Sequence, residues 1–198
     1  METPDLRVLY TELLRRHGPQ GWWWPGENPF EIAIGAVLVQ RSRWGQAVIS
    51  LRNLERAGLL APTPLAGATE ETIRSLVRGS GFPTVKPRRL QALAAWWVQR
   101  YSTVSAMTDA EARVELLGIE GVGEETADAI SLYVLRRPAF LCDEYARRLL
   151  TDRGWDVPRS YRAFRRALDP ALQEARFSVA ELAELHGLIV EEGKLRGR

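Results

Sequence analysis

Cysteine, histidine and lysine are scarce in this sequence of 198 residues, and each shortage excludes a kind of site. Cys142 is the only cysteine, so the chain alone cannot hold an intramolecular disulfide, a four-thiolate zinc site or a four-cysteine iron–sulfur cluster. His17 and His186 have no companion ligands, and no metal site is predicted. Lysine occurs only at Lys86 and Lys194, which leaves 25 arginines among the 27 basic residues. A mechanism that needs a lysine amine therefore has two side chains to use.

The sequence also has no long apolar run and no charged, apolar leader at its start. We therefore expect a cytoplasmic protein that is neither secreted nor anchored in a membrane. Hydrophobic residues make up 45% of the chain and charged residues 26%, which is typical of globular proteins with one compact domain or two small ones.

Helical periodicity is present in nearly every segment, and runs of alternating β-branched residues are absent, which predicts an all-α protein. Thr3-Pro4 should open the first helix. The segment 28–31, Asn-Pro-Phe-Glu, combines an N-cap, a proline at the first helical position and a carboxylate three residues after the cap. The apolar helix that follows, 32–39, should be central and buried. Further helices are expected over 42–57, 69–78, 85–101, 108–117 and 124–136, and from near 143, 158 and 177, with connecting turns at 60–68 and 79–87.

Two long stretches carry no acidic residue, although the net charge is only +2. Residues 32–54 contain three arginines, and residues 72–108 contain five arginines and Lys86. Stretches of this kind can face the phosphates of a nucleic acid. From charge alone, a solvated helix face is the commoner explanation, so that alternative stays open.

The most informative local feature is a two-glycine turn between two predicted helices, in the segment 117–130. Gly121 and Gly123 lack a Cβ atom, so backbone N–H groups at the start of the second helix can approach an anion such as a DNA phosphate. Ile119 and Val122 should anchor the turn in the core. A Gly-x-Gly sequence alone also fits simple packing of two helices, whereas this order of helix, apolar turn and second helix is more specific.

The segment 117–130 resembles the helix-hairpin-helix motif, and Asp143 extends the resemblance. Asp143 follows Gly123 by 20 residues, which is the separation found in helix-hairpin-helix DNA glycosylases of the endonuclease III superfamily. These enzymes excise damaged bases from double-stranded DNA in base excision repair. The resemblance implies that Gly121, Gly123 and Thr126 contact DNA phosphate. It also implies that main-chain carbonyls of the hairpin can hold a monovalent cation.

The resemblance covers almost the whole chain and implies an all-α fold of two lobes with the active-site groove between them. One helical lobe, 28–137, would end in the hairpin, and a discontinuous lobe would join 1–27 to 138–198. Gln40 matches the glutamine that the family inserts into DNA, and Phe82 matches the residue of its wedge loop. We expect a monomer that binds double-stranded DNA containing damaged bases, in the nucleoid if the host is bacterial.

Two departures from endonuclease III itself indicate the branch. Bifunctional members have a lysine two residues after the last glycine of the hairpin, which attacks the sugar C1′ and leads to strand cleavage. This sequence has Glu125 there. A carboxylate cannot form an imine, so we expect no AP-lyase activity unless another amine substitutes. The four-cysteine loop of endonuclease III is also missing, so we expect no iron–sulfur cluster and no other cofactor apart from the hairpin cation.

Both departures resemble the 3-methyladenine DNA glycosylase III branch, which shares the Trp-Trp-Trp-Pro sequence of residues 22–25. In that branch the alkylated base lies between aromatic rings. The matching residues here are Trp24 with Pro25 on one side and Trp44 on the other, with Lys194 lining the pocket. One residue differs, because the branch has a lysine directly after His-Gly in its final helix where this sequence has Leu188.

The resemblance implies a monofunctional DNA glycosylase that flips alkylated purines such as 3-methyladenine out of the duplex and hydrolyses their glycosidic bond. Asp143 would stabilise the oxocarbenium-like C1′ and orient the attacking water, and it also fits a helix N-cap. Two alternatives stay open. One is an endonuclease III-like glycosylase for oxidised pyrimidines or mismatched bases, which would need hydrogen-bond donors in its pocket. The other is a non-catalytic helix-hairpin-helix DNA-binding protein, which would gain nothing from this carboxylate.

Overall fold

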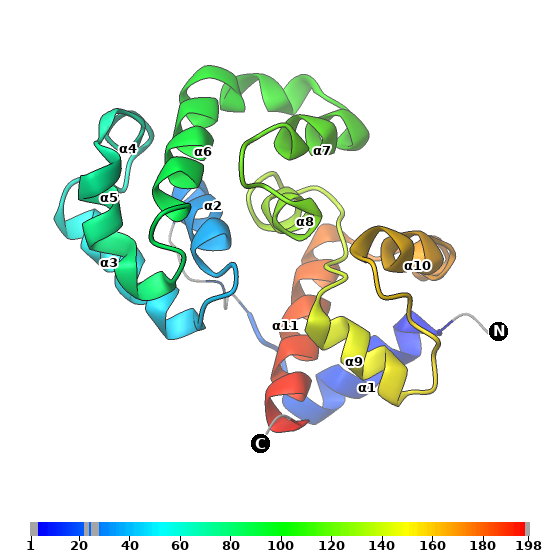
Figure 1. Ribbon diagram of the computed structural model, residues 1–198. Coiled ribbons are helices and arrows are strands. Elements are labelled where there is room, and N and C mark those ends of the chain that lie inside the picture. Colours follow the sequence, from blue (N-terminus) through cyan, green and yellow to red (C-terminus); the bar gives the residue numbers. More distant parts are fainter. Residues whose placement is uncertain (1–3, 22–23, 25–27, 197–198) are drawn as a thin grey trace. The chain divides into compact units, whose positions relative to one another are not determined.

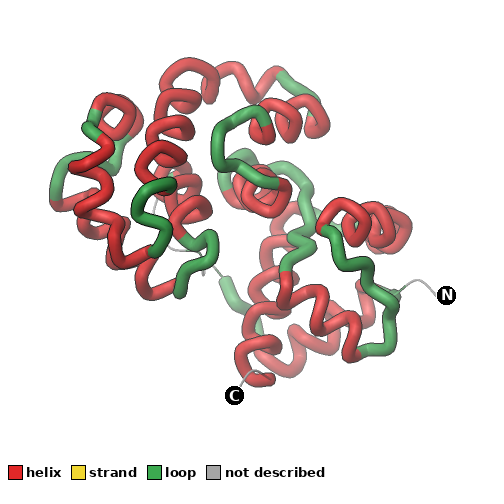
Figure 2. Tube along the Cα trace, viewed as in Figure 1, coloured by secondary structure: helices red, strands yellow, loops and turns green. Residues whose placement is uncertain are grey.

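The computed structural model describes residues 4–21, 24 and 28–196, and these form eleven α-helices and two short 3-10 helices (Figures 1 and 2). No strand occurs in these ranges, and the predicted all-α class is confirmed. Nor does any helix within them combine the length and apolar character that crossing a bilayer requires.

Contacts between Cα atoms divide the chain into two compact units. We call residues 24–135 the hairpin unit, and residues 1–23 together with 136–198 the terminal unit. The division proposed from the sequence falls at residues 28 and 137.

The hairpin unit is built around α2, the helix that follows Asn28. Its helices are α2 (Pro29–Leu38), α3 (Trp44–Arg56), α4 (Pro62–Gly67), α5 (Glu70–Val77), η1 (Arg78–Ser80), α6 (Lys86–Arg100), η2 (Tyr101–Ala106), α7 (Asp109–Leu117) and α8 (Glu124–Tyr133). The Asn28 side chain accepts a hydrogen bond from the Glu31 backbone N–H at 3.1 Å, as the predicted N-cap requires. Residues 32–38 are all buried, and α2 packs against α3, α6 and α8. The predicted central helix is confirmed.

Helix α4 corrects one prediction, because segment 60–68 is expected to be a turn and instead contains this helix. Pro62 stands at the start of this helix, where the missing N–H of proline removes no helical hydrogen bond. Leu65 is fully buried, and α4 packs against α6. Prolines that resemble chain breakers in the sequence therefore begin a short helix.

The terminal unit brings the two ends of the chain into one core. Its helices are α1 (Leu6–His17), α9 (Glu144–Asp152), α10 (Tyr161–Ala175) and α11 (Val179–Arg196). Helix α11 packs against α1 and α9, and α1 also packs against α10. The cap of α1 is Asp5, whose side chain accepts from the Val8 N–H at 2.9 Å, so the predicted start at Thr3-Pro4 is wrong. Thr3 itself lies outside the described residues.

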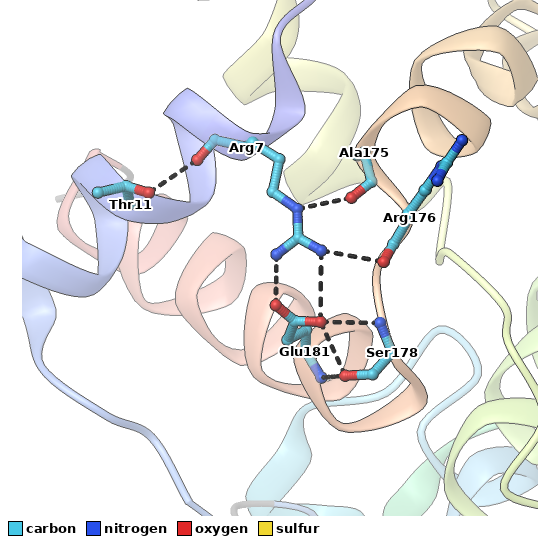
Figure 3. Close-up of polar contacts among 6 residues, drawn as sticks. All are labelled: Arg7, Thr11, Ala175, Arg176, Ser178 and Glu181. Atoms are coloured by element: carbon cyan, nitrogen blue, oxygen red, sulfur yellow. Dashed lines mark hydrogen bonds and ion pairs between the residues drawn. The ribbon is translucent and has the colours of Figure 1, made fainter.

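Arg7 joins three helices of the terminal unit through one guanidinium group (Figure 3). Its Nε donates to the carbonyl oxygen of Ala175 at 2.6 Å, and one terminal nitrogen donates to that of Arg176 at 3.0 Å. The same guanidinium forms an ion pair with Glu181 on α11, which also accepts from the Ser178 backbone N–H at 2.8 Å. The last carbonyls of α10 are thereby satisfied by a side chain of α1.

The ion pair between Arg7 and Glu181 predicts a pH-dependent stability. The hydrogen bond from Arg7, followed by those from Ser178, lowers the pKa of Glu181 from 4.5 to about 2. A lowered carboxyl pKa stabilises the fold above the unfolded value, and this contribution is lost as the pH falls from 4.5 towards 2. Arg7 is 41% exposed and solvent screens the pair, so we expect Glu181→Gln to cost about 1 kcal/mol at neutral pH and little near pH 2.

Urea unfolding across this pH range measures the effect. Glu174→Gln, an exposed carboxylate on α10, is the matched control and should leave the pH dependence unchanged. A Glu181→Gln deficit that stays constant down to pH 2 would contradict the assignment of the pH dependence to this carboxylate.

Candidate functional site

The two-glycine turn joins α7 to α8, as the sequence predicts. Ile119 and Val122 are buried and anchor the turn, and Gly123 is the N-cap of α8. Arg113 on α7 forms a bidentate ion pair with Asp128 on α8, with Nε to Oδ1 at 2.7 Å and the Asp128 side chain buried. The hairpin is therefore held from both sides, and the backbone N–H groups at the start of α8 have a fixed direction.

Gln40 is bonded to this hairpin in the structure. Its side-chain Nε2 donates to the carbonyl oxygen of Gly121 and to the hydroxyl of Thr126, both at 2.9 Å. Its Oε1 accepts from Arg89 at 2.8 Å. The structure thus brings three sequence-predicted site residues, Gln40, Gly121 and Thr126, into one hydrogen-bonded group. Arg89 is a further member that the sequence analysis does not single out.

Gly121 could not be another residue without a local rearrangement. Its φ is +86°, in the left-handed region that favours glycine. A Cβ atom placed there would also lie 2.2 Å from Cγ of Arg89. The first requirement comes from the backbone of the turn and the second from the close approach of Arg89 on α6.

Acidic residues surround the turn, which opposes the approach of a phosphate. Glu120 forms an ion pair with Arg88 on α6 at 2.8 Å, and this pair offsets one of the charges. Glu125, at the position of the lyase lysine, is exposed in the first turn of α8, where the helix dipole favours a carboxylate.

An aromatic cluster lies in the hairpin unit at the predicted base pocket. The buried ring of Trp24 stacks on Tyr133 of α8, with centroids 4.8 Å apart and planes at 27°. Trp44, exposed at the start of α3, meets Trp24 edge-on, with centroids 5.3 Å apart and planes at 89°. A base could stack between Trp24 and Trp44 only after the Trp44 ring turns. Pro25 lies outside the described residues.

The wedge residue Phe82 is exposed and has an unusual backbone conformation. Its φ is +50°, and Arg41, next to Gln40, has a φ of +49°. The guanidinium carbon of Arg41 lies 5.9 Å from the centre of the Phe82 ring. Non-glycine residues in this region carry backbone strain and cluster at functional sites. Arg41 is one of the three arginines of the acid-free stretch 32–54, and its backbone geometry makes it a candidate site residue.

Asp143 belongs to the terminal unit and is the N-cap of α9, as the sequence predicts. Its Oδ1 accepts from the Ala146 backbone N–H at 2.8 Å. Its Oδ2 lies 3.4 Å from Nε2 of His186 on α11, and both side chains are largely buried. One carboxylate oxygen is thus engaged by a helix N-terminus and the other by an imidazole. The sequence assigns His186 to no metal site and places it in the final helix of the resemblance, but the 43 residues that separate it from Asp143 hide this contact.

Known proteins resemble the chain over most of its length, although no protein-family model matches it. A protein of Methanocaldococcus jannaschii, whose name places it among the DNA repair glycosylases, is 36% identical over 151 residues, 74% of this chain and 68% of that protein. Endonuclease III of Thermotoga maritima is 27% identical over 167 residues, 84% of this chain and 74% of that protein. The chain belongs to the endonuclease III superfamily of DNA glycosylases.

A solved structure extends the likeness to the whole fold of this glycosylase. The crystal structure of 3-methyladenine DNA glycosylase from H. pylori, bound to 1,N6-ethenoadenine, matches it with a TM-score of 0.80 and 27% identity. The match covers 96% of this chain and 95% of that one. The helix-hairpin-helix glycosylase fold predicted from the sequence is confirmed.

The two lysines of the glycosylase have different surroundings. Lys86 is fully buried, and its Nζ donates to the carbonyl oxygens of Leu38 at 2.6 Å and Ser80 at 2.5 Å. Burial, followed by the charge of Arg89, lowers the pKa of Lys86 to about 8. Lys194 is exposed on α11 and forms an ion pair with Glu191 at 2.5 Å. Lys194 belongs to the terminal unit and the tryptophan pair to the hairpin unit, so its predicted place in the pocket stays a prediction.

Side chains that commonly bind metal ions do not cluster in the part of this glycosylase that the structure describes. Within 4–21, 24 and 28–196, His, Cys, Asp and Glu nowhere gather in threes as ligands that could hold a metal ion. Cys142 is buried, and one thiol does not fit a four-cysteine cluster. Leu188, at the position of the branch's lysine, is fully buried in α11.

Proposed function

We propose that this DNA glycosylase removes alkylated purines such as 3-methyladenine from double-stranded DNA by hydrolysis, without cutting the strand. The observation that carries the proposal is the cluster of Trp24, Trp44 and Tyr133 in the hairpin unit. The name of the H. pylori relative, a 3-methyladenine DNA glycosylase, supports the same class of base.

The aromatic cluster suits a base that is large, flat and positively charged. Flipping a nucleotide costs a few kcal/mol of unstacking and unpairing. Stacking on an aromatic ring returns about 1 to 3 kcal/mol per base, and a cation over an electron-rich ring adds roughly 0.5 to 2 kcal/mol. Trp24 rests on Tyr133 and forms a fixed wall, while Trp44 is the exposed ring that turns to admit the base. A neutral oxidised pyrimidine has a smaller ring than an alkylated purine, so it would gain less stacking energy and no cation–π energy.

In the proposed reaction, water replaces the alkylated purine at C1′. The glycosidic C–N bond breaks with both electrons passing to the purine, which neutralises its positive ring and makes it a good leaving group. The sugar carbon becomes oxocarbenium-like, and the oxygen of a water molecule forms the new bond. Asp143 is assigned the stabilisation of this charge and the orientation of the water, whose proton passes to the carboxylate or to solvent. His186 holds the second carboxylate oxygen in place.

Amine chemistry has poor candidates among the side chains that the structure describes. Glu125 cannot attack C1′ to form an imine. Lys86 is enclosed and bonded to two carbonyl oxygens, although its pKa of about 8 would otherwise favour a nucleophilic amine. Lys194 is exposed but paired with Glu191. We therefore propose a monofunctional enzyme, and the single thiol of Cys142 leads us to propose that it works without an iron–sulfur cluster.

A substrate panel tests the proposed function. Duplexes that carry 3-methyladenine, 7-methylguanine, hypoxanthine, thymine glycol or a mismatch are assayed separately for base release and for strand cleavage, with borohydride present in parallel reactions. We expect release of alkylated purines, intact strands and no borohydride-trapped protein–DNA adduct. Release of thymine glycol with a strong trapped adduct would instead support the endonuclease III-like alternative. DNA binding with no base release would support the non-catalytic one.

A further inference from the structure

Lys86 occupies a place where lysine is rarely found. It is the first residue of α6, and its side chain is 0% exposed. Lysine is almost never fully buried unless its charge has partners, because removing an ammonium from water is strongly unfavourable. The sequence from 72 to 108 around it contains no acidic residue. The ammonium is satisfied by backbone carbonyl oxygens instead.

The two carbonyl groups belong to the two segments that carry the residues proposed to enter DNA. Leu38 ends α2 and lies two residues before Gln40, and Ser80 ends η1 and lies two residues before Phe82. The backbone N–H of Lys86 also donates to the carbonyl oxygen of Phe82 at 3.1 Å. One residue is therefore hydrogen-bonded to both segments.

The same turn of α6 contacts the glutamine directly. Arg89, three residues after Lys86, donates to Oε1 of Gln40 at 2.8 Å and packs on Gly121. An apolar side chain at Lys86 could fill the space without the cost of burying a charge, and replacements of that kind are often neutral or stabilising. Packing alone therefore does not account for an ammonium at this point, whereas a need for fixed spacing does.

We propose that Lys86 is a positioning residue for base extrusion, because its ammonium fixes the separation of the segments that carry Gln40 and Phe82. The two side chains then reach the DNA stack together, one at the vacated position and one as the wedge. This inference rests on the proposed function and adds to it the residue that holds Gln40 and Phe82 at a fixed separation. Lys86 touches neither the base nor the sugar.

The test separates extrusion from chemistry. Excision by the wild type and by Lys86→Met is compared under single-turnover conditions on two duplexes. In one, 3-methyladenine lies opposite thymine. In the other, it lies opposite an abasic-site analogue, so no base pair has to be broken. We expect Lys86→Met to slow excision of the paired base by about 10- to 100-fold and of the unpaired base by about threefold or less. Equal slowing on both substrates would overturn the proposal.

Gln91→Met is the matched control. Gln91 lies on the same helix, and its Nε2 donates to a backbone carbonyl oxygen, that of Ala68, at 2.7 Å. The variant removes a hydrogen bond from a side-chain nitrogen to a backbone carbonyl oxygen, at a place away from Gln40 and Phe82. It should not change the ratio of the two rates. Absence of excision by the wild type on both substrates would count against the proposed function itself, which distinguishes that failure from failure of the positioning role.

A second variant keeps the test decisive if Lys86→Met does not fold. Lys86→Gln retains an N–H donor for one of the two carbonyl oxygens and should recover part of the paired-base rate. It is combined with Phe82→Ala in a double-mutant cycle. Because Lys86 is assigned a role that acts through the inserted residues, its effect should shrink once Phe82 is removed. Strictly additive effects on the paired substrate would overturn the proposal.

Discussion

Asp143→Asn should bind DNA that contains an alkylated purine as tightly as the wild type does, and should excise the base about 100- to 10,000-fold more slowly. The amide has the shape of the carboxylate but no negative charge to stabilise a positive C1′. Asparagine is as good an N-cap as aspartate, so the hydrogen bond from the Ala146 N–H and the start of α9 should survive. Single-turnover base release and a DNA-binding titration measure the two effects separately.

The matched control is Asn28→Asp, which makes the reverse exchange at the N-cap of α2. It should leave excision nearly unchanged. It should lower the free energy of unfolding slightly, because the Asn28 Nδ2 that donates to Oε1 of Glu31 at 2.6 Å is replaced by a second carboxylate oxygen. Excision by Asp143→Asn within a fewfold of the wild-type rate would remove Asp143 from the mechanism. A large loss of stability in Asp143→Asn would show that the Asp143 carboxylate stabilises the fold through contacts other than its N-cap hydrogen bond.

Leu188→Lys should lower the free energy of unfolding by about 3 to 5 kcal/mol near neutral pH, the usual cost of an unpaired buried charge. Leu188 is 0% exposed in α11, a helix that packs against both α1 and α9. The branch that the sequence resembles has a lysine here, so the substitution also asks whether this chain tolerates the residue of its relatives. At high pH the buried amine should be uncharged in the folded protein. The loss in the free energy of unfolding should therefore become smaller as the pH approaches 10. Urea unfolding at several pH values measures it.

Leu195→Lys is the control on the same helix, because Leu195 is 57% exposed. It should change the free energy of unfolding by less than about 0.5 kcal/mol. Equal stability of Leu188→Lys and Leu195→Lys would mean that a group of the terminal unit compensates the buried ammonium.

Local signals in the sequence predict the helices well wherever a cap specifies a start. Asn28 caps α2, and Thr108 with Glu111 forms the capping box that begins α7. The exceptions have local causes. The carboxylate of Asp5 begins α1, and Pro62 begins α4, because a proline in the first turn and a proline in a loop look the same in a sequence.

The contacts of the site are far less visible in the sequence. Gln40 and Thr126 are 86 residues apart, and Asp143 and His186 are 43 apart, so neither pair leaves a spacing pattern. Tyr133 is one aromatic residue among many until the fold stacks it on Trp24. Family resemblance supplied Gln40, Phe82 and Asp143, whereas the roles of Lys86 and Arg89 follow only from tertiary hydrogen bonds.

The hydrogen bonds of Gln40 set a threshold for the proposed insertion into DNA. To enter the duplex, the glutamine must give up its bonds to Gly121, Thr126 and Arg89, each worth about 0.5 to 1.5 kcal/mol. On undamaged DNA, no flipped base binds in the pocket to offset this cost. We therefore expect the Gln40 side chain to stay hydrogen-bonded to the hairpin and the base pairs to remain closed. In the proposed mechanism, the bonded position of Gln40 is therefore its resting position, and leaving it costs these three hydrogen bonds.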